Sequence, residues 1–468
     1  MPDLQHLSCP RDGWLEAELG DANLGDFRLK RRVVDLAQAL GAQPSLSIQQ
    51  ACGSWRTAKA AYRFFDGGAE SSAAIRQAHT DATKARAGQC QVVLAVQDTT
   101  SLDFTHHPDT SGLGYLETRK RQGLVVHSTL AVTLDGVPLG LLAQQVWARD
   151  TDQRGIRHHR RERAIQSKES FKWLQAVAES RQGLTDGTIL LHVGDRESDV
   201  YDLFLAAQGQ PDTALLVRAT RDRRIAEDEA RLWAYMRGLP EQARRLVTLP
   251  RSQSHTGREA RLGIRWAPVT IRPPKYRSHE PLAPLKLHAV LVEEQPEESD
   301  AKPICWLLLT TLPVEEAEFA WQLVTWYGYR WRIERYHYIL KSGCRIEERQ
   351  LGTAERLDCC LALYSVIASR LLMLTYLART APNEPGASLL NPDEWRVLWA
   401  KQHRGKPAPR HPTLRQVVRE IACLGGFLGR RGDGEPGAKS LWRGLQRLND
   451  LLLGYEMALS FHRLRGNE

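Results

Sequence analysis

The first half of the chain alternates between helical and strand-like patterns of hydrophobic positions. Residues 14–66 carry a helical pattern that includes the basic run RLKRR. The segment QVVLAVQDTTSLDFT, residues 91–105, is typical of a buried strand that ends in an acidic turn. Two further strands are predicted over residues 123–150 and are joined at Asp135-Gly136, because Asp-Gly between hydrophobic runs is a strong hairpin signal.

A helix and a strand–helix unit follow, and then the composition and the hydrophobic pattern of the sequence change. ESFKWLQAVAES, residues 169–180, predicts a helix, and GTILLHVGDRESDVYDLFLAA, residues 187–207, predicts a strand that leads at once into a helix. Between about 219 and 312, short alternating or apolar segments are separated by Pro-, Ser- and Arg-rich connections. This β-rich block lies between a βα unit and a helix, so we expect it to be an insertion.

The last part of the chain is predicted to be helical. The most apolar segment starts at Leu357, but it contains Asp358 and Arg370, which indicates a core or interface helix rather than a membrane span. TAPNEPGAS, residues 380–388, is expected to be a linker, and the helices after it have wide apolar faces. The chain as a whole is expected to have an α+β (mixed) fold with a helical C-terminal module.

Charge and cysteine content indicate which partner the protein binds and in which compartment it lies. The 468 residues carry a net charge of +9 and the pI is about 9.2, which favours a polyanionic partner such as nucleic acid. The eight cysteines include no CxxC pair, so we expect reduced thiols that serve as small apolar residues in a cytosol. The N-terminus lacks the basic-then-apolar pattern of a signal peptide. A cytoplasmic protein without a membrane partner is therefore expected.

Three acidic residues lie where a metal site can form. Asp98 ends the predicted strand VVLAVQD, Asp195 ends ILLHVGD, and Glu334 lies on a later helix. Ligands bind at the carboxyl ends of strands in open α/β sheets, and Mg²⁺ prefers carboxylate and water oxygens. A pair of such ions would stabilise the attacking and leaving oxygens of a phosphoryl displacement. The alternatives are structural: a turn former at Asp98, a helix N-cap at Asp195 and a solvated side chain at Glu334.

The stretch YGYRWRIERYHYILK, residues 327–341, is expected to form one short helix. At about 100° per residue, Glu334 shares one side of that helix with three residues that project within roughly 40° of it: Tyr327, Arg330 and Lys341. One carboxylate flanked by two cations and a phenol suits a site that handles a phosphate beside a metal. A solvated polar face is the alternative.

Taken in chain order, these motifs resemble the signature of a known group. QDTT around Asp98, GDRE around Asp195, and Tyr-x2-Arg-x3-Glu-x6-Lys from Tyr327 are similar to the bacterial cut-and-paste insertion-sequence transposases with a DDE triad and a YREK signature, of the Tn-five type and IS-four family. The similarity runs from LGDFRLKRR and AAYRFF through LLLTTLPVE to LGGFLGRRG, which is nearly the whole chain. It implies an RNase H-like mixed β-sheet flanked by helices, with a β-rich insertion before the glutamate helix.

The resemblance also implies three domains. Residues 1–70 would be an N-terminal helical DNA-end-binding region. Residues 71–378 would be an RNase H-like catalytic domain with the β-rich insertion at about 219–312, and residues 379–468 would be a C-terminal helical dimerisation module. The protein would act as a homodimer in a synaptic complex of paired transposon ends, in the bacterial cytoplasm and associated with the nucleoid.

The chemistry implied by the resemblance is metal-dependent DNA transposition. Asp98, Asp195 and Glu334 would be catalytic and would hold two Mg²⁺ ions, with Mn²⁺ as a substitute. The enzyme would bind double-stranded DNA at terminal inverted repeats, nick one strand, form a hairpin with the freed 3′-hydroxyl, and join the 3′ ends to target DNA. The alternatives are a catalytically inert end-binding protein or transposition inhibitor, and a two-carboxylate hydrolase that uses no metal.

Further DNA contacts follow from the same resemblance. Tyr327, Arg330 and Lys341 would bind phosphates near the scissile bond. Arg218 in LLVRAT would add another phosphate contact, with an ordinary strand-end cation as the alternative. Trp306 in CWLLLTT would stack on a base that leaves the duplex when the hairpin bends the DNA. By chemistry alone, Trp306 is more typical of a core position.

The N-terminal basic run and the paired histidines complete the candidate residues. The run would contact phosphates and groove of the terminal repeat, with a solvated basic face as the alternative; its cations are Arg28, Lys30, Arg31 and Arg32. Two histidine pairs have no cysteine partners at ligand spacing, so no zinc site is expected there; they are His106-His107 and His158-His159.

Overall fold

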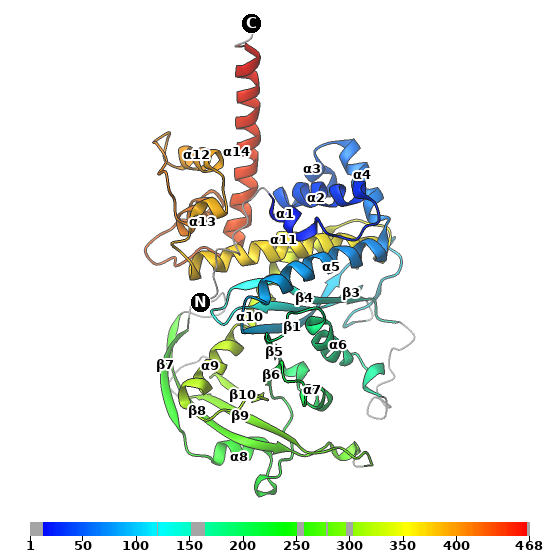
Figure 1. Ribbon diagram of the computed structural model, residues 1–468, viewed down its shortest axis with the longest axis vertical. Coiled ribbons are helices and arrows are strands. Elements are labelled where there is room, and N and C mark those ends of the chain that lie inside the picture. The colour runs from blue at the N-terminus through cyan, green and yellow to red at the C-terminus, as the bar shows by residue number, and fades with distance from the viewer. Residues whose placement is uncertain are drawn as a thin grey trace.

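The computed structural model describes residues 13–118, 120–150, 164–249, 257–277, 279–295 and 303–465. Within these residues, helices surround one large mixed sheet and a long C-terminal helix stands away from the body (Figure 1). The α+β (mixed) class is confirmed. The pair His158-His159 lies outside the described residues.

Ten strands of the described residues form the sheet. Their order is β2-β3-β1-β5-β6-β10-β9-β8-β7, and β4 pairs with β3. In chain order the strands are β1 (Val92–Asp103), β2 (Gly114–Tyr115), β3 (Gln122–Val132), β4 (Pro138–Trp147), β5 (Ile189–Gly194), β6 (Thr213–Arg218), β7 (Ala243–Leu249), β8 (Arg258–Ile271), β9 (Leu285–Glu294) and β10 (Cys305–Thr310). The central strands β1, β5 and β6 are parallel, and the neighbours on both sides are antiparallel to them.

The hairpin predicted around Asp135-Gly136 is confirmed. β3 and β4 pair antiparallel, and Gly136 in their connection has a φ of 83°. This left-handed backbone conformation strains residues that carry a Cβ, which explains the glycine at this turn. The hairpin places β3 along β1 from Leu94 to Asp103.

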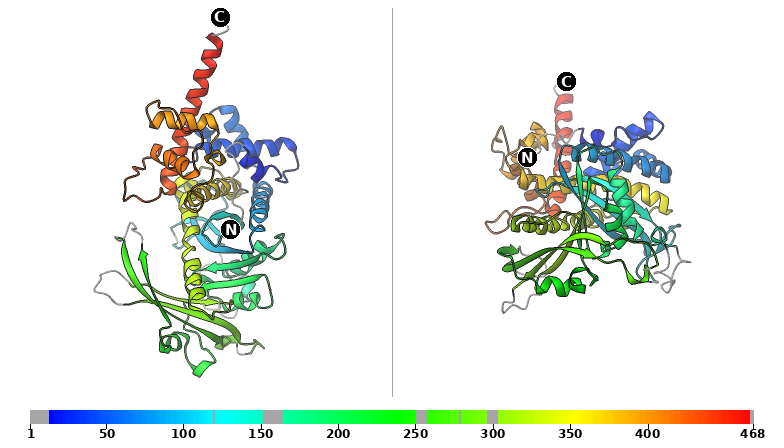
Figure 2. Two further views of the ribbon diagram at one scale, coloured as in Figure 1. Left: turned by 60° about the vertical axis from the view of Figure 1, so that its left-hand side comes forward. Right: turned by 60° about the horizontal axis from the view of Figure 1, so that its bottom comes forward.

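The β-rich block predicted at about 219–312 contains β7 to β10, and its strands extend the central sheet. β10 pairs antiparallel with β6, with Leu309 opposite Val217, so no break separates the block from the parallel strands. Figure 2 shows β7 to β9 curving away from the body as a continuation of the same sheet. The side chains of β10 therefore lie beside those of β6, close to the central strands.

The helices pack around the sheet in separate groups. In chain order they are α1 (Trp14–Leu19), α2 (Phe27–Ala42), α3 (Ile48–Cys52), α4 (Trp55–Phe65), α5 (Gly68–Ala87), α6 (Phe171–Arg181), α7 (Tyr201–Ala207), α8 (Leu232–Gly238), α9 (Ala317–Gly328), α10 (Trp331–Tyr338), α11 (Ala354–Thr380), α12 (Pro392–Gln402), α13 (Leu414–Leu424) and α14 (Ala438–Arg465). α5 and α11 pack against each other and against β4. α9 and α10 lie on one side of the central strands, and α6 and α7 lie on the other (Figure 2).

The apolar helix predicted from Leu357 is the central helix of the core. α11 is long and apolar enough to cross a membrane, but 89% of its most apolar window is buried inside the protein. Its side chains contact α2, α4, α5, α13 and α14, so it joins the N-terminal and C-terminal helices to the sheet. The prediction of a core helix is therefore confirmed.

A buried ion cluster fixes the first helix on the sheet domain. Glu18 of α1 accepts hydrogen bonds from Nδ1 of His79 and from Nη1 of Arg86, both at 2.6 Å. His79 Nε2 accepts from the backbone N–H of Leu141 at 3.1 Å, so the proton of the neutral ring is on Nδ1. Burial acts to raise the pKa of Glu18, but His79 and Arg86 together hold it at about 2.

We expect the Glu18→Ala variant to be destabilised by about 3 kcal/mol at neutral pH, because Arg86 would keep a partly buried charge without its carboxylate. The pKa of Glu18 is lower in the folded than in the unfolded state. The stabilisation is therefore present at neutral pH and is lost as the pH falls from about 4.5 towards 2. Thermal unfolding measured between pH 7 and pH 3 checks this. Glu16→Ala, on the exposed side of the same helix, is the control, and an equal loss in both variants would contradict the role of the cluster.

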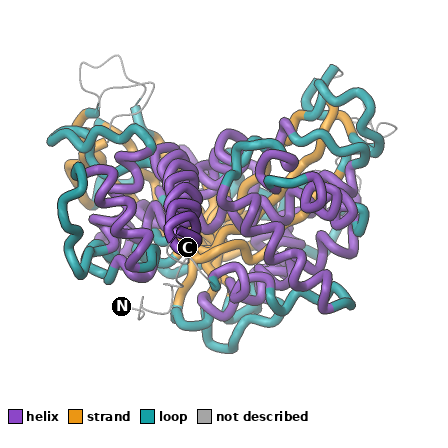
Figure 3. Tube along the Cα trace, turned by 90° about the horizontal axis from the view of Figure 1, so that it is seen from above, coloured by secondary structure: helices purple, strands orange, loops and turns teal. Residues whose placement is uncertain are grey.

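The C-terminal module consists of α12, α13 and α14, and α14 projects beyond the others. The first half of α14 packs on α13 and contributes the buried side chains Leu441, Trp442 and Leu448. Its second half is exposed from Leu453 to His462. Seen from above, α14 is viewed almost along its axis, with other helices on both sides of its base (Figure 3). The predicted helical C-terminal module is confirmed.

Candidate active site

Asp98 lies inside β1 and does not end the strand, which corrects the prediction. β1 continues to Asp103 because β3 pairs with it throughout, with Ser128 opposite Asp98. The prediction that Asp98 ends the strand, and its alternative role as a turn former, are both wrong, because β1 ends at Asp103. The parallel partner β5 does stop here: the last pair is Val96 with Val193. Asp98 therefore lies just beyond the carboxyl end of the parallel pairing.

Asp195 follows β5 directly, as predicted. Continuing the register of β1 and β5 by two residues places it level with Asp98 at the same edge of the sheet. Its Oδ1 accepts from the backbone N–H of Glu197 at 2.8 Å and caps the short 3₁₀ helix Arg196–Ser198. Asp195 therefore acts as a helix cap, which was the alternative to its predicted metal-binding role. The cap uses only one of its two carboxylate oxygens.

Arg330 joins the carboxylates of β1 and α10. Its Nη1 lies 3.7 Å from Oδ2 of Asp98, and its Nη2 donates to Oε1 of Glu334 at 2.5 Å. The side chain of Arg330 is 11% exposed, and its buried Nε has no hydrogen-bond partner among the described residues. A half-satisfied guanidinium therefore lies between two acidic side chains that are 236 positions apart in the sequence.

Burial raises the pKa of Asp98 to about 7, against the lowering effects of the Thr99 N–H and Arg330. Asp195 and Glu334 act in the same direction as burial, because each adds negative charge near Asp98. The three acidic residues named from the sequence are therefore close enough to influence one another electrostatically. The single positive charge of Arg330 does not balance the negative charges of these three carboxylates.

Residues 327–341 do not form the single regular helix that was expected. α9 ends at Gly328, α10 begins at Trp331, and a π-helical turn occupies Ile339–Gly343. The constant step of about 100° per residue does not hold across these changes. Tyr327, Arg330 and Glu334 nevertheless lie near the same site, because the residues between the two helices keep right-handed helical dihedral angles.

Lys341 points to the strand that carries Asp98, but further along it. Its Nζ donates to the carbonyl oxygen of Ser101 at 2.6 Å and lies 3.6 Å from Oε1 of Glu347. The π-helical turn directs Lys341 towards β1 at this point. It is therefore beside the carboxylate site without contacting the carboxylates.

A second group, made by Tyr327, Trp306 and Arg218, extends the site along β6 and β10. The rings of Trp306 and Tyr327 meet edge to face with centroids 5.1 Å apart, and the guanidinium of Arg218 lies 5.9 Å from the Trp306 ring centroid. Arg218 also donates to the carbonyl oxygen of Cys305 at 3.0 Å. Burial raises the pKa of Tyr327, so its hydroxyl keeps its proton and can donate. Trp306 is partly buried, neither fully in the core nor fully exposed.

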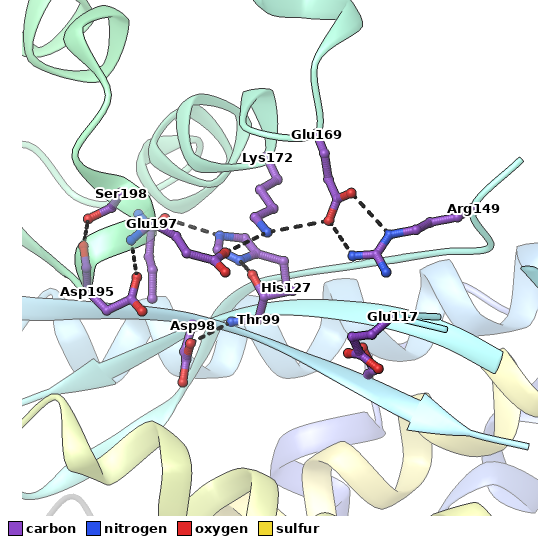
Figure 4. Close-up of polar contacts among 12 residues, drawn as sticks. Asp98, Thr99, Glu117, His127, Arg149, Glu169, Lys172, Asp195, Glu197 and Ser198 are labelled. Atoms are coloured by element: carbon purple, nitrogen blue, oxygen red, sulfur yellow. Dashed lines mark hydrogen bonds and ion pairs between the residues drawn. The ribbon is translucent and has the colours of Figure 1, made fainter. Parts of the chain in front are cut away.

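A buried hydrogen-bonded network, missed from the sequence, supports the strand beneath Asp98 (Figure 4). Thr99 bonds His127 Nδ1 at 2.9 Å, His127 Nε2 bonds Gln97 Oε1 at 3.2 Å, and Gln97 Nε2 bonds His192 Nδ1 at 2.9 Å. The Gln97 amide donates to His192 Nδ1, so the His192 ring is neutral, and the amide Oε1 accepts from His127 Nε2. Burial agrees, because it lowers the pKa of His127 well below its usual value and that of His192 to about 3. The sequence did carry a signal for this network, because Gln97, His127 and His192 are polar residues inside the apolar strands VVLAVQD, LVVHST and ILLHVG.

The N-terminal basic run lies on α2, well before the carboxylates in the sequence. Lys30 is partly buried and the other three cations, Arg28, Arg31 and Arg32, are exposed. None of the four forms an ion pair with a described residue. Phe27 and Leu29 are exposed beside them, at 77% and 37%. The helix therefore offers a basic surface with apolar side chains within it, as DNA-binding surfaces do.

The carboxylates are not preassembled around a metal position in this conformation. Among the described residues, no group of three or more His, Cys, Asp and Glu side chains is arranged to hold a metal ion, and this includes His106 and His107. Arg330 instead lies between Asp98 and Glu334. The Asp, Asp and Glu oxygens are nevertheless the donor types that Mg²⁺ and Mn²⁺ accept.

Two segments of the chain match known protein families. Residues 11–69 match the family described as Transposase DNA-binding, and they include α1 to α4 and the basic run of α2. Residues 366–464 match the family described as Transposase Tn5 dimerisation domain, and they extend from within α11 through α14. The carboxylate site lies between these two segments in the sequence. The matches at opposite ends of the chain therefore support a transposase of the Tn5 type, with a DNA-binding segment and a dimerisation segment.

Proposed function

We propose that the chain is a metal-dependent DNA transposase of the DDE type with an RNase H-like core. It binds the terminal inverted repeats of its element, excises the element by nicking and hairpin formation, and joins the 3′ ends to target DNA. The observation that carries the proposal is the proximity of Asp195 and Glu334 to Asp98, with Arg330 lying between Asp98 and Glu334. The matches to DNA-binding and dimerisation families support it.

Asp98, Asp195 and Glu334 are the proposed ligands of two Mg²⁺ ions, with Mn²⁺ as a substitute. The donor set is made of hard carboxylate oxygens. Burial, with smaller effects of Asp195 and Glu334, raises the pKa of Asp98, and a bound cation would favour its ionised form. When bound, the ions supply Lewis-acid stabilisation of the attacking and leaving oxygens of an in-line phosphoryl displacement.

Arg330 exchanges partners in this proposal. Without DNA it neutralises Asp98 and Glu334, and on DNA binding it turns to a phosphate, which a guanidinium can bind through two parallel N–H groups. The unpartnered Nε supports this role, since a buried donor without an acceptor is costly unless a ligand satisfies it. Tyr327 donates its hydroxyl, and Arg218 and Lys341 place positive charge beside the same backbone.

Trp306 is the proposed platform for the base that leaves the duplex during hairpin formation. Its partly exposed ring contacts Tyr327 and lies near Arg218, two of the proposed phosphate contacts. We expect Trp306→Ala to slow hairpin formation about tenfold or more and to leave first-strand nicking nearly unchanged, because stacking on an aromatic ring contributes about 1–3 kcal/mol per base. Gel analysis of nicked and hairpin products checks this. Trp306→Phe, which keeps a ring, is the control, and equal slowing of both steps would refute the platform role.

A plasmid that carries two inverted transposon ends tests the function as a whole. Incubation with the protein and Mg²⁺ should give nicked products and an excised fragment, and EDTA should abolish both. Binding of the ends without cleavage would favour the inert end-binding protein or transposition inhibitor. Hydrolytic activity that survives EDTA would favour the metal-free two-carboxylate hydrolase.

The proposed assembly is a homodimer that holds two transposon ends in a synaptic complex, in the cytoplasm and near the nucleoid. The match to a dimerisation family supports homodimer formation, and the exposed second half of α14 offers an apolar surface for it. Joining of both 3′ ends to one target requires two active sites held together, which a dimer provides. The basic run of α2 is the proposed contact with the terminal repeat.

A further inference from the structure

A cavity of about 990 Å³ opens beside Asp195, on the side of the sheet where α6 and α7 lie. Three of its cationic residues come from separate segments: Arg196 follows Asp195 after β5, Arg221 follows β6, and Lys275 lies in the connection between β8 and β9. The carboxyl ends of parallel strands are the edge at which open α/β sheets bind ligands. The cavity is lined by Arg196, the residue that follows Asp195, so it lies beside the proposed active site.

The acidic side chains in the cavity wall are largely neutralised by partners. Asp199 is buried and accepts from Arg223 Nε at 3.0 Å and from the backbone N–H of Arg221 at 2.9 Å. Glu169 lies 2.7 Å from Arg149 (Figure 4). Another wall residue, Asp202, lies 2.7 Å from Arg277, and Glu197 lies 3.4 Å from Lys172. The negative charge of the wall is thus compensated within the protein.

Three cations of the wall have no such compensation. Arg196, Arg221 and Lys275 are exposed, and none forms an ion pair with any residue that the structure describes. Tyr276, beside Lys275, is 42% exposed and offers an aromatic ring at the rim. Unpaired cations around an open groove, with an aromatic ring among them, match the charge and shape of a sugar-phosphate backbone.

We propose that this groove, defined by Arg196, Arg221 and Lys275, binds the backbone of target DNA during strand transfer. The inference rests on the proposed transposase function. The proposed contacts with the transposon end, from Tyr327 to Arg330, reach the carboxylates from the α9–α10 side, whereas the groove reaches Arg196, next to Asp195, from the α6–α7 side. In an in-line displacement the attacking and leaving groups lie on opposite sides of the phosphorus, so the two DNA segments need separate approaches.

The test uses the variant Arg196→Ala/Arg221→Ala/Lys275→Ala in the full-length protein. With pre-cleaved transposon ends, a target plasmid and Mg²⁺, we expect strand transfer at subsaturating target to fall at least about tenfold, because the variant removes three cations that bind phosphates. First-strand nicking of ends that still carry flanking DNA should stay within about twofold of wild type, because the end contacts are intact.

A binding measurement provides a readout without catalysis. The protein, assembled on pre-cleaved ends in EDTA, is titrated with a labelled non-specific duplex at several salt concentrations. The slope of log K against log [salt] should become shallower by about 3 in the variant, because each phosphate that the protein no longer neutralises changes the slope by about 0.9.

Two variants control for charge and folding. Lys401→Ala/Lys406→Ala/Arg410→Ala removes the same charge from exposed positions in and after α12, and should behave as wild type. Arg196→Lys/Arg221→Lys/Lys275→Arg keeps the charge of the groove and should keep most of the strand transfer.

Three results would overturn the proposal or its basis, and they are distinguishable. Loss of nicking with normal strand transfer would assign the groove to flanking donor DNA instead of target. Unchanged strand transfer and an unchanged salt slope would show that no DNA backbone lies there. Failure of the proposed function would appear separately, as wild-type protein that neither nicks nor joins ends in Mg²⁺.

Discussion

Asp98→Asn, Asp195→Asn and Glu334→Gln should each reduce cleavage of transposon ends by about 10³-fold or more, because each removes a metal-binding carboxylate and with it several kcal/mol of transition-state stabilisation. Binding of a transposon end should stay near the wild-type value, because the basic run of α2 is unchanged. The amides preserve shape, and Asp195→Asn retains a side-chain oxygen that can cap the short 3₁₀ helix after β5. Gel assays of nicking, with end binding measured by mobility shift, check both parts.

The control for these variants is Glu117→Gln. Glu117 is exposed and accepts from Ser101 Oγ at 3.0 Å, so it is an acidic neighbour of β1 outside the carboxylate site. It should cleave as wild type. Normal nicking by any one of the three site variants would remove that residue from the catalytic set.

The triple variant Leu453→Ser/Met457→Ser/Phe461→Ser should weaken the homodimer by about 10³-fold, since burial of one such side chain contributes roughly 1.5–3 kcal/mol. These side chains are 53%, 62% and 64% exposed and repeat every four residues, so they share one side of the projecting half of α14. Excision of fragments bounded by two ends should fall in parallel, while binding to a single end remains. Sedimentation analysis measures the oligomeric state.

Leu246→Ser is the matched control for the dimer prediction. Leu246 is 56% exposed on β7, so the substitution removes one exposed apolar side chain, as each change of the triple variant does, from an element other than α14. It should leave the dimer intact. A triple variant that still dimerises as wild type would show that another surface joins the protomers.

The local elements could be predicted from the sequence because their signals are local. Apolar runs indicated β3 and β4, and Asp-Gly between them indicated their turn. Asp195 was placed correctly after β5, since that strand ends where its apolar run ends. The end of β1 was misplaced because β3 continues to pair with it past Asp98, and pairing with a distant strand leaves no mark in the local pattern.

Features that depend on packing between distant segments could not be predicted. The break between α9 and α10 and the π-helical turn at Lys341 interrupt a sequence that shows uniform helical periodicity. The pairing of β10 with β6, which makes the β-rich block part of the central sheet, is also a long-range contact. The groove cations come from three segments, so no single motif contains them. Arg196 was within a recognised motif, GDRE, but only the cavity beside it gives it a role.

Anomalous diffraction from crystals of the protein bound to a transposon end and soaked in Mn²⁺ tests the central claim most directly. We expect two anomalous peaks about 3.5–4 Å apart, contacted by Asp98, Asp195 and Glu334, with Arg330 turned to a phosphate. Crystals in which Arg330 still bridges Asp98 and Glu334, with no manganese beside them, would contradict the assignment of these carboxylates as the metal site.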